Sequence, residues 1–230
     1  MVNETIRKRK SIRKYDPEPL GDTAIAQVLD QIAGVSPLYP GIRFSIGITG
    51  KVRGIFGLSA PHYLTFHSEE GDGAYENIGF IGQQMDLFFS GSGIGSCWLG
   101  MAKPPDNANN DMPFVIGMAF GNPAEPLHRA EPDFKRKPLS AISEGDDGRL
   151  EAARLAPSGM NAQNWFFVAQ GGKIHCYRKK TILALGGARL GCIDMGIAIC
   201  HIAKESSEFS FIKETGMPGR KGFIYTGTVA

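Results

Sequence analysis

The sequence predicts an α+β fold made of two related halves, each with an antiparallel-rich sheet packed by helices. Two observations carry this prediction. The order helix, turn, strand, second strand, buried helix and strand occurs twice along the 230 residues. Each half also contains one helical stretch, at 74–91 and at 190–203, that is apolar nearly all round. Such a helix belongs at the centre of a fold, because no face of it suits solvent.

The first half begins with a short helix that cannot continue through Asp16-Pro17-Glu18-Pro19, because proline lacks the amide hydrogen and restricts the residue before it. Asp22 or Thr23 caps the next helix. For the glycine-rich segment 91–100, we expect a helix C-cap and a tight turn. The expected elements are helices at 3–10 and 22–34, strands at 43–48 and 62–66, a helix at 74–91 and a strand at 114–120.

The second half follows a polar, proline-rich stretch at 122–137, for which we expect a long surface excursion. Its first helix begins at Asp146 or Asp147, and Pro157 stops it. The further elements are strands at 165–169 and 173–177, a helix at 190–203 and closing strands at 209–213 and 222–229. We therefore expect one unit over 1–230 with internal repeats at 1–140 and 141–230, a fused two-fold dimer.

Composition excludes several classes of protein. The net charge of +2 is too weak to indicate a nucleic-acid partner. The four cysteines form no C-x-x-C pair and have no histidine cluster beside them, so neither zinc nor a disulfide framework is expected. The chain shows no signal-peptide pattern and no run near the roughly 20 apolar residues of a membrane span. We expect a cytoplasmic protein without a membrane partner.

The segment Arg9-Lys10-Ser11-Ile12-Arg13 is a candidate anion site. Arginine presents a planar fork that binds phosphate oxygens in pairs, and serine adds a donor. Residues 1–14 hold six basic side chains against one acid, and a solvated helix face or a nucleic-acid module over 7–14 would also account for such a run. The nucleic-acid alternative predicts strongly salt-dependent binding.

The stretch 156–167 is the most informative part of the chain. Its helix ends at a proline, and the following turn exposes Ser158, Asn161 and Gln163 before an apolar strand. An ordinary capped turn would also look like this. Amide and hydroxyl groups without acids nevertheless suit a neutral polar ring edge, such as the pyrimidine of a flavin. Together with a cationic cradle for a phosphate, the turn points to flavin mononucleotide (FMN).

Two further segments fit the same site. The Gly-x-Gly-x-Gly run at 91–95 follows a helix rather than a strand, which excludes a Rossmann fingerprint. Just after it, Trp98-Leu99-Gly100-Met101 can bring backbone amides and a flat apolar surface against a ring. Lys135 and Arg136 are either a solvated charge run or the completion of the phosphate cradle. No Ser/His/Asp triad is indicated, and the five histidines lie near no motif.

Taken together, these residues resemble the FMN-dependent nitroreductase family. That family has an Arg-x-Ser-x-Arg-like segment, a Pro-Ser-x-x-Asn-x-Gln-Pro-Trp-like turn and a Gly-x-Gly-x-Cys-Trp segment after a central helix. The matching positions here are 9–13, 157–165 and 93–98. Two departures stand out. Asn164 replaces the proline of the turn, and the turn follows the Lys-Arg pair instead of the Arg-rich segment. The order resembles the tandem-repeat branch of the family, with one composite FMN site.

The resemblance implies a role for each matched residue. Arg9, Lys10 and Ser11 would bind the phosphate with Lys135 and Arg136, and Arg13 would lie towards the N1/O2 edge of the ring. Trp98, Leu99 and Gly100 would lie by N5, whereas Pro157, Ser158, Asn161 and Gln163 would cover the ring. It also implies ping-pong transfer of electrons from NAD(P)H to nitroaromatics, quinones or similar small acceptors. No catalytic side chain is demanded, since the flavin performs the chemistry.

Two points stay open on the sequence. A non-catalytic flavin-binding protein for storage or sensing would carry the same motifs. A monomer would suffice if the two halves already form the family's dimer interface, and a homodimer is a second option.

Overall fold

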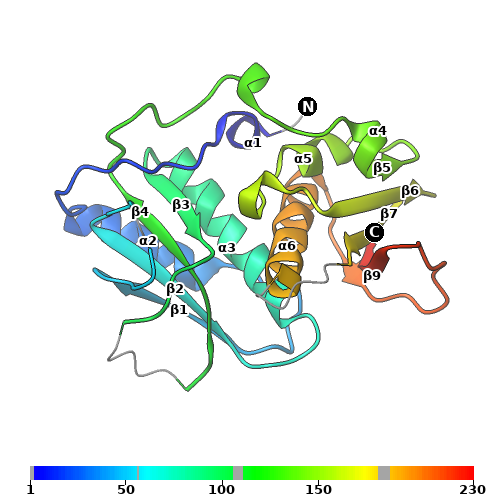
Figure 1. Cartoon of the computed structure of the whole chain (residues 1–230), viewed down its shortest axis with the longest axis horizontal. Coiled ribbons are helices and arrows are strands. Elements are labelled where there is room, and N and C mark those ends of the chain that lie inside the picture. The colour runs from blue at the N-terminus through cyan, green and yellow to red at the C-terminus, as the bar shows by residue number, and fades with distance from the viewer. Residues whose placement is uncertain (1–2, 56, 106–110, 181–186) are drawn as a thin grey trace.

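The computed structural model describes residues 3–55, 57–105, 111–180 and 187–230. Figure 1 shows two sheets on opposite sides of a pair of long helices, α3 (Ala74–Gly91) and α6 (Gly187–Glu205). Both helices are buried along most of their described length, as their apolar patterns predict. No helix in these ranges is both long and apolar enough to cross a membrane.

The first sheet has four antiparallel strands in the order β1-β2-β4-β3. They are β1 (Phe44–Thr49), β2 (His62–Ser68), β4 (Phe114–Gly121) and β3 (Gly95–Leu99). The expectation of only a cap and turn over 91–100 is therefore wrong for its second part. One turn lies at the start, where Gly93 has a φ of 82°, and a second begins at Gly100, after β3. Gly95 then opens β3, where a Cβ atom would lie 2.9 Å from the Ile12 side chain, so glycine permits this close approach.

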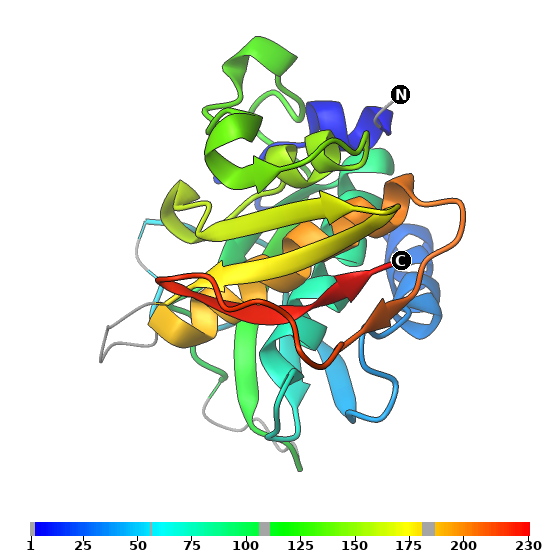
Figure 2. The same cartoon turned by 90° about the vertical axis from the view of Figure 1, so that its right-hand side faces the viewer.

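The second sheet has the order β5-β6-β7-β9-β8, and Figure 2 shows its outer face. The β5–β6 pair is parallel and the other pairs are antiparallel. Its strands are β5 (Ser143–Glu144), β6 (Trp165–Gln170), β7 (Lys173–Lys179), β9 (Phe223–Val229) and β8 (Phe211–Ile212). The strand expected at 209–213 is thus much shorter, and β5 was not predicted.

Four shorter helices complete the described fold: α1 (Glu4–Lys8), α2 (Asp22–Gly34), α4 (Leu139–Ile142) and α5 (Leu150–Leu155). Helix α5 begins later than predicted. The carboxylate of Asp147 accepts a hydrogen bond from the Arg149 backbone N–H, which leaves the residues before 150 in a turn. Single 3₁₀ turns occur at Glu131–Asp133 and Gly159–Asn161.

Helices α3 and α6 cross at a point where each contributes a glycine, Gly79 and Gly196. A Cβ atom on Gly79 would lie 2.0 Å from the carbonyl oxygen of Ile193, and one on Gly196 would lie 1.9 Å from that of Glu76. The two contacts are reciprocal, because each glycine meets the residue three positions before the other. The absence of side chains at this point lets the backbones approach one another directly.

The N-terminal segment lies along the edge of the first sheet. The Ile12 N–H donates to the Ser96 carbonyl of β3, and Tyr15 donates its hydroxyl to the Ile12 carbonyl. On its other side, Arg9 forms a β-bridge with His128. The loop after β4 therefore runs beside the basic segment.

Candidate functional site

Two neighbouring cavities open beside the N-terminal segment. One is polar, with a volume of about 590 Å³, and the other is mostly apolar, with a volume of about 280 Å³. Five residues line both cavities, so the two spaces adjoin: Ser11, Arg13, Pro157, Ser158 and Met160. Together they are of the size of a small-molecule or cofactor site.

The polar cavity is strongly cationic. Six basic side chains and one carboxylate, that of Asp133, line it within the described part of the chain. Lys10 is partly neutralised by Glu125, 2.9 Å from its Nζ. The basic residues come from the N-terminal segment and from the loop before α4: Arg9, Lys10, Arg13, Arg129, Lys135 and Arg136.

Arg9 is a basic side chain of this cavity that the protein core holds in place. It is only 1% exposed, and its Nε lies 2.7 Å from the Asp86 carboxylate, which is equally buried. Asp86 also accepts hydrogen bonds from the Ser96 hydroxyl at 2.7 Å and from the Gln83 amide at 2.9 Å. Its charge is therefore compensated by an ion pair and two donors, as a buried carboxylate requires. Arg9 further donates from Nη2 to the Ser11 hydroxyl.

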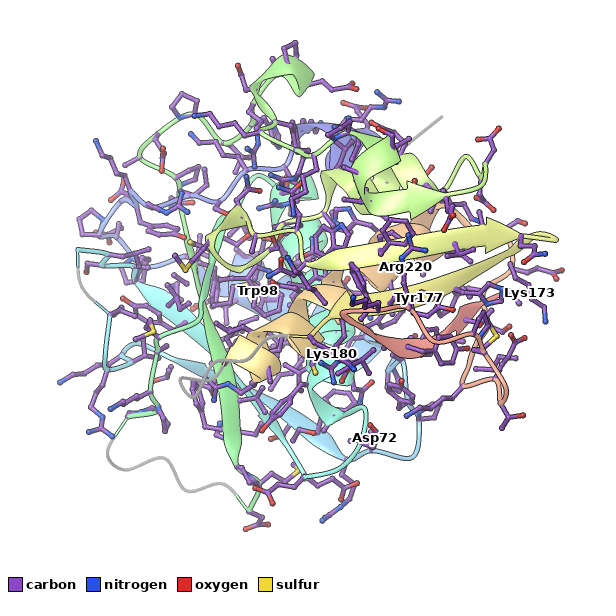
Figure 3. All side chains as sticks on the ribbon, turned by 45° about the vertical axis from the view of Figure 1, so that its right-hand side comes forward. Asp72, Trp98, Lys173, Tyr177, Lys180 and Arg220 are labelled. Carbon is purple, nitrogen blue, oxygen red and sulfur yellow. The ribbon has the colours of Figure 1, made fainter. Side chains whose placement is uncertain are left out.

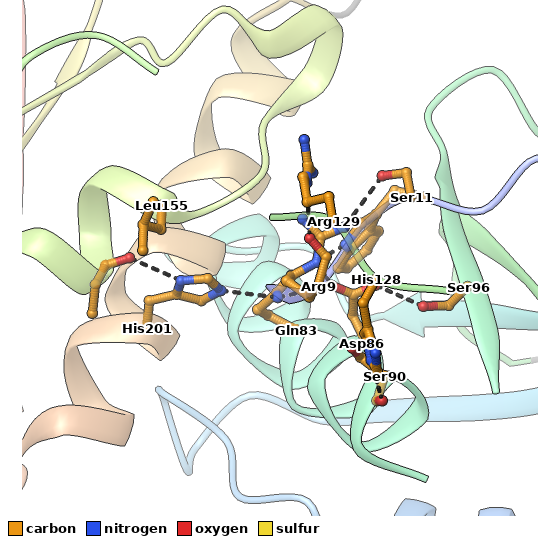
Figure 4. A network of polar contacts seen from close by, with 12 residues as sticks. Arg9, Ser11, Gln83, Asp86, Ser90, Ser96, His128, Arg129, Leu155 and His201 are labelled. Carbon is orange, nitrogen blue, oxygen red and sulfur yellow. Dashed lines mark hydrogen bonds and ion pairs between the residues drawn. The ribbon is translucent and has the colours of Figure 1, made fainter. Parts of the chain in front are cut away.

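Behind Asp86 the network reaches α6 (Figure 4). The Gln83 amide nitrogen lies 3.0 Å from His201 Nε2, and His201 Nδ1 lies 2.9 Å from the Ala152 carbonyl. The carbonyl can only accept, so His201 carries its proton on Nδ1 and accepts from Gln83 at Nε2. Burial lowers the pKa of His201 to about 3, which keeps it neutral. Gln83 also accepts from the Trp98 indole.

Arg136 and Arg129 complete the cationic wall. Burial, followed by the neighbouring charges of Arg9 and Arg129, lowers the pKa of Arg136 to about 9. Burial and Arg9 lower the pKa of Arg129 to about 10. Both groups remain cationic at neutral pH, and no carboxylate among the described residues lies within 4 Å of Arg136. The wall therefore holds uncompensated positive charge.

Two guanidinium nitrogens in this wall lack partners. Arg9 Nη1 and Arg136 Nε are buried and have no hydrogen-bond partner among the described residues. Buried polar groups are nearly always hydrogen-bonded, and leaving a charged one unpaired is costly. Both side chains line the polar cavity. An anion with several acceptor oxygens, such as a phosphate group, fits these donors.

The turn at 158–163 forms the opposite wall and is strained. Met160, Asn161 and Gln163 all have positive φ, at 52°, 56° and 49°, a region that non-glycine residues rarely adopt. Strain of this kind persists only where the surroundings enforce it, and it clusters at ligand sites. Met160 is fully exposed and lines both cavities.

Hydrogen bonds to the basic loop enforce this conformation. The Asn161 amide donates to the Lys135 carbonyl at 2.7 Å and accepts from Arg136 Nη1 at 2.7 Å. The Gln163 side chain accepts from the Lys137 N–H, and the Ser158 hydroxyl accepts from the Gln163 N–H. The amides predicted to face a ring therefore bind the basic loop in this structure.

The smaller cavity is walled mainly by apolar side chains. Trp98 lines it and stacks on Phe66, with 5.8 Å between ring centroids. Trp98, labelled in Figure 3, belongs to β3. Asp194 of α6 lines the same cavity and accepts a hydrogen bond from the Gly159 N–H. Other apolar lining comes from the first sheet and from α6: Met101, Ile116, Leu190, Ile193 and Ile197.

The structure brings eleven of the thirteen predicted residues to these cavities. Leu99 and Gln163 do not line either cavity formed by the described residues. Leu99 is buried with Tyr63 and Val52 in a separate apolar cluster, as alternation along β3 places it on the face opposite to Trp98. Gln163 is buried and braces the turn instead.

Sequence reasoning missed several lining residues, among them His128, Arg129, Met160 and Asp194. The expectation that the histidines lie near no motif is wrong for His128, which pairs with Arg9 and lines the polar cavity. The sequence around His128 does not reveal this position, because the loop that carries it is distant in sequence from the N-terminal segment. Arg129 precedes the predicted Lys-Arg pair by only six residues, and its charge was the available signal.

Comparisons with known proteins agree with this architecture. Residues 1–206 match the family described as "Putative TM nitroreductase". A "putative nitroreductase" from Thermotoga maritima shares the fold, with a TM-score of 0.68 at 21% identity over 98% of this chain and 90% of that one. The predicted α+β nitroreductase-like fold is thus confirmed.

Shorter structures match part of the chain. A nitroreductase family protein of Clostridium difficile 630 aligns at 16% identity over 61% of this chain and 96% of its own, with a TM-score of 0.49. An "FMN-dependent Nitroreductase" of Clostridium difficile R20291 aligns at 17% identity over 57% and 93%, with a TM-score of 0.47. The comparison with curated proteins gave no match.

Proposed function

This chain belongs to the nitroreductase family that its residues 1–206 match, and we propose that it is an FMN-dependent oxidoreductase. In this proposal it takes electrons from NAD(P)H and passes them, by a ping-pong mechanism, to a nitroaromatic, a quinone or a similar small acceptor. The observation that carries the proposal is the junction of a cationic cavity with an apolar one at Ser11, Arg13 and Ser158.

The cationic cavity suits the phosphate of FMN. Arg9 Nη1 and Arg136 Nε offer buried donors without partners in the described chain, and Ser11 adds a hydroxyl beside them. Lys135 lines the same cavity. A phosphate at this place would complete the hydrogen bonding of both arginines, which favours it over a neutral ligand.

The apolar cavity suits the flavin ring. Its volume is close to the lower end of the range for small-molecule sites, and Trp98, Gly100 and Pro157 line it as the family resemblance implies. Arg13 lies at the junction, where a cation would favour negative charge on a bound ring. FMN supplies hydride transfer when bound, and the chain binds, orients and tunes it.

One FMN per chain follows from the proposal that the two halves form an internal two-fold pair. The reciprocal contacts of Gly79 and Gly196 are those of a symmetric interface, where residue i meets j and j meets i. Two positions before each glycine, Asn77 and Asp194 accept hydrogen bonds from the turn of their own half. The repeated arrangement supports the halves 1–140 and 141–230.

The proposed pair would have a second composite position, next to the turn of the first half. The turn of the first half carries Tyr39, whose ring packs edge-on against Phe211 at 5.6 Å and lies so close to Gly73 that a Cβ atom there would clash with it at 2.7 Å. We infer that this packed side chain stands in place of a second ring, which leaves one site per chain. A single site per chain makes a monomer sufficient for function.

A flavin titration tests the proposal. The purified chain should bind FMN at about one per chain, and the bound flavin should bleach anaerobically when NADH or NADPH is added. Binding without bleaching by either donor would favour the non-catalytic flavin-binding protein. No binding after reconstitution would refute the cofactor assignment.

A further inference from the structure

Asp194 stands apart from the rest of the apolar cavity. It is the only carboxylate among the described residues that line this space, and it is 6% exposed. Its Oδ1 accepts a hydrogen bond of 2.8 Å from the Gly159 N–H, and no other hydrogen bond to this side chain occurs among the described residues. A buried carboxylate usually has an ion-pair partner or several donors, as Asp86 has. Asp194 has neither.

Support of the turn does not require an acid. In the first half, Asn77 stands at the corresponding place before Gly79, and its amide oxygen accepts from the backbone N–H groups of Leu38 and Tyr39. A neutral amide therefore performs the same task in the first half. The acid occurs only in the half whose turn borders the cavity, which indicates a role for its proton.

The surroundings keep this proton bound up to neutral pH. Burial raises the pKa of Asp194 to about 7, against a smaller lowering effect of the Gly159 N–H. Among the described residues, the other charged or titratable side chains that line this cavity are Arg13 and Cys97. Burial raises the pKa of Cys97 as well, so the thiol stays protonated.

We propose that Asp194, at the wall of the apolar cavity, is the proton donor for an acceptor that is reduced beside the flavin ring. This inference rests on the proposed function. Reduction of a quinone by two electrons adds one hydride and one proton, and reduction of a nitro group to a nitroso group and water has the same balance. Bound FMN would supply the hydride, and the Asp194 carboxyl would give its proton to an acceptor oxygen. The carboxylate left behind takes a proton from solvent.

The two half-reactions can be measured separately by stopped-flow spectroscopy of the FMN-loaded chain between pH 5 and pH 9. In Asp194→Asn, the Gly159 hydrogen bond can persist, because the amide oxygen also accepts. We expect re-oxidation by a benzoquinone to slow by about 100-fold at pH 6, within the range for general acid catalysis. The wild-type rate should fall above pH 7, and the variant should lack this break.

Ferricyanide is the matched acceptor, because it takes single electrons and no proton. Re-oxidation by ferricyanide and reduction by NAD(P)H should change less than about 3-fold in Asp194→Asn. Asp72→Asn, a change at an exposed aspartate 86% accessible at its side chain, controls for the substitution itself. Equal slowing with both acceptors would mean that Asp194 only holds the turn, and this would overturn the proposal.

Infrared spectroscopy gives a readout that needs neither donor nor acceptor. The protonated carboxyl band of the chain should lose intensity with a midpoint near neutrality, and Asp194→Asn should lack this component. If no FMN binds, the proposed function fails, and the infrared titration alone decides whether Asp194 holds an exchangeable proton.

If Asp194→Asn does not fold, Asp194→Glu takes its place and should retain the pH break with the quinone. A pH-independent quinone rate in the wild type would overturn the proposal.

Discussion

Gly79→Ala tests whether direct contact between helix backbones holds the core together. The new methyl group would lie 2.0 Å from the Ile193 carbonyl oxygen, about 1.4 Å short of an ordinary contact. The opposing atom belongs to the backbone of α6, so a change of rotamer cannot relieve the overlap and the helices must separate. Overpacking costs about 1–3 kcal/mol and occasionally more, and the better helix propensity of alanine returns up to about 1 kcal/mol. We expect a net loss of roughly 1–3 kcal/mol.

Thermal and urea unfolding measure this loss. For a domain of this size, 1 kcal/mol corresponds to roughly 2–4 °C in Tm, so the Tm should fall by roughly 2–12 °C. The control is Gly34→Ala, a substitution at the end of α2, where no atom lies within 4 Å of the position that the added methyl group would take. This variant should be unchanged or up to about 1 kcal/mol more stable. If the two variants differ by less than about 1 kcal/mol, the close crossing of α3 and α6 is refuted.

Three further outcomes are expected. Arg136→Ala should weaken FMN binding by roughly 10- to 100-fold in a fluorescence titration, because a charge-assisted hydrogen bond contributes about 1.5–3 kcal/mol; Arg43→Ala, at an exposed ion pair, should bind FMN as the wild type does. Asp86→Asn should lower the free energy of unfolding by about 3–5 kcal/mol, since it leaves Arg9 as an uncompensated buried charge. Added FMN should restore part of that loss, and no difference between the FMN-loaded and FMN-free variants would contradict the phosphate assignment. The raised pKa of Asp194 means that the folded state binds its proton more tightly than the unfolded state, so its contribution to stability is present at low pH and is lost as pH rises from about 4 to about 7. Urea unfolding at pH 5 and pH 8 should therefore show a steeper decline for the wild type than for Asp194→Asn.

Local patterns predicted most of the fold. The apolar stretches became α3 and α6, and α3 spans the residues expected for it, 74–91. Strand β3 was missed, because glycines favour a turn locally while pairing with β4 and contact with Ile12 depend on distant residues. A similar limit applied to β5, which has two residues and pairs with β6.

The motifs predicted which segments build the site, but not how their side chains are used. Asn161 and Gln163 were expected to face a ring, and they instead fasten the turn to the basic loop. Gln83 and His201 lie on two different helices far apart in the sequence, so nothing in their sequence context marks them as partners of one another. Their pairing depends on the packing of α3 against α6.

That packing also explains why the cationic cavity can be rigid although loops form most of its wall. Arg9 lies on an irregular segment, and its guanidinium is nevertheless held by Asp86 on α3 at 2.7 Å. Asp86 is held in turn by Gln83, which contacts His201 on α6. The position of the central positive charge is therefore set by the two core helices, from both halves of the chain. A ligand site requires such support, because a guanidinium on a free loop would lose affinity to conformational entropy. The sensitivity of FMN binding to Asp86→Asn thus measures how far the core, rather than the loops, determines the site.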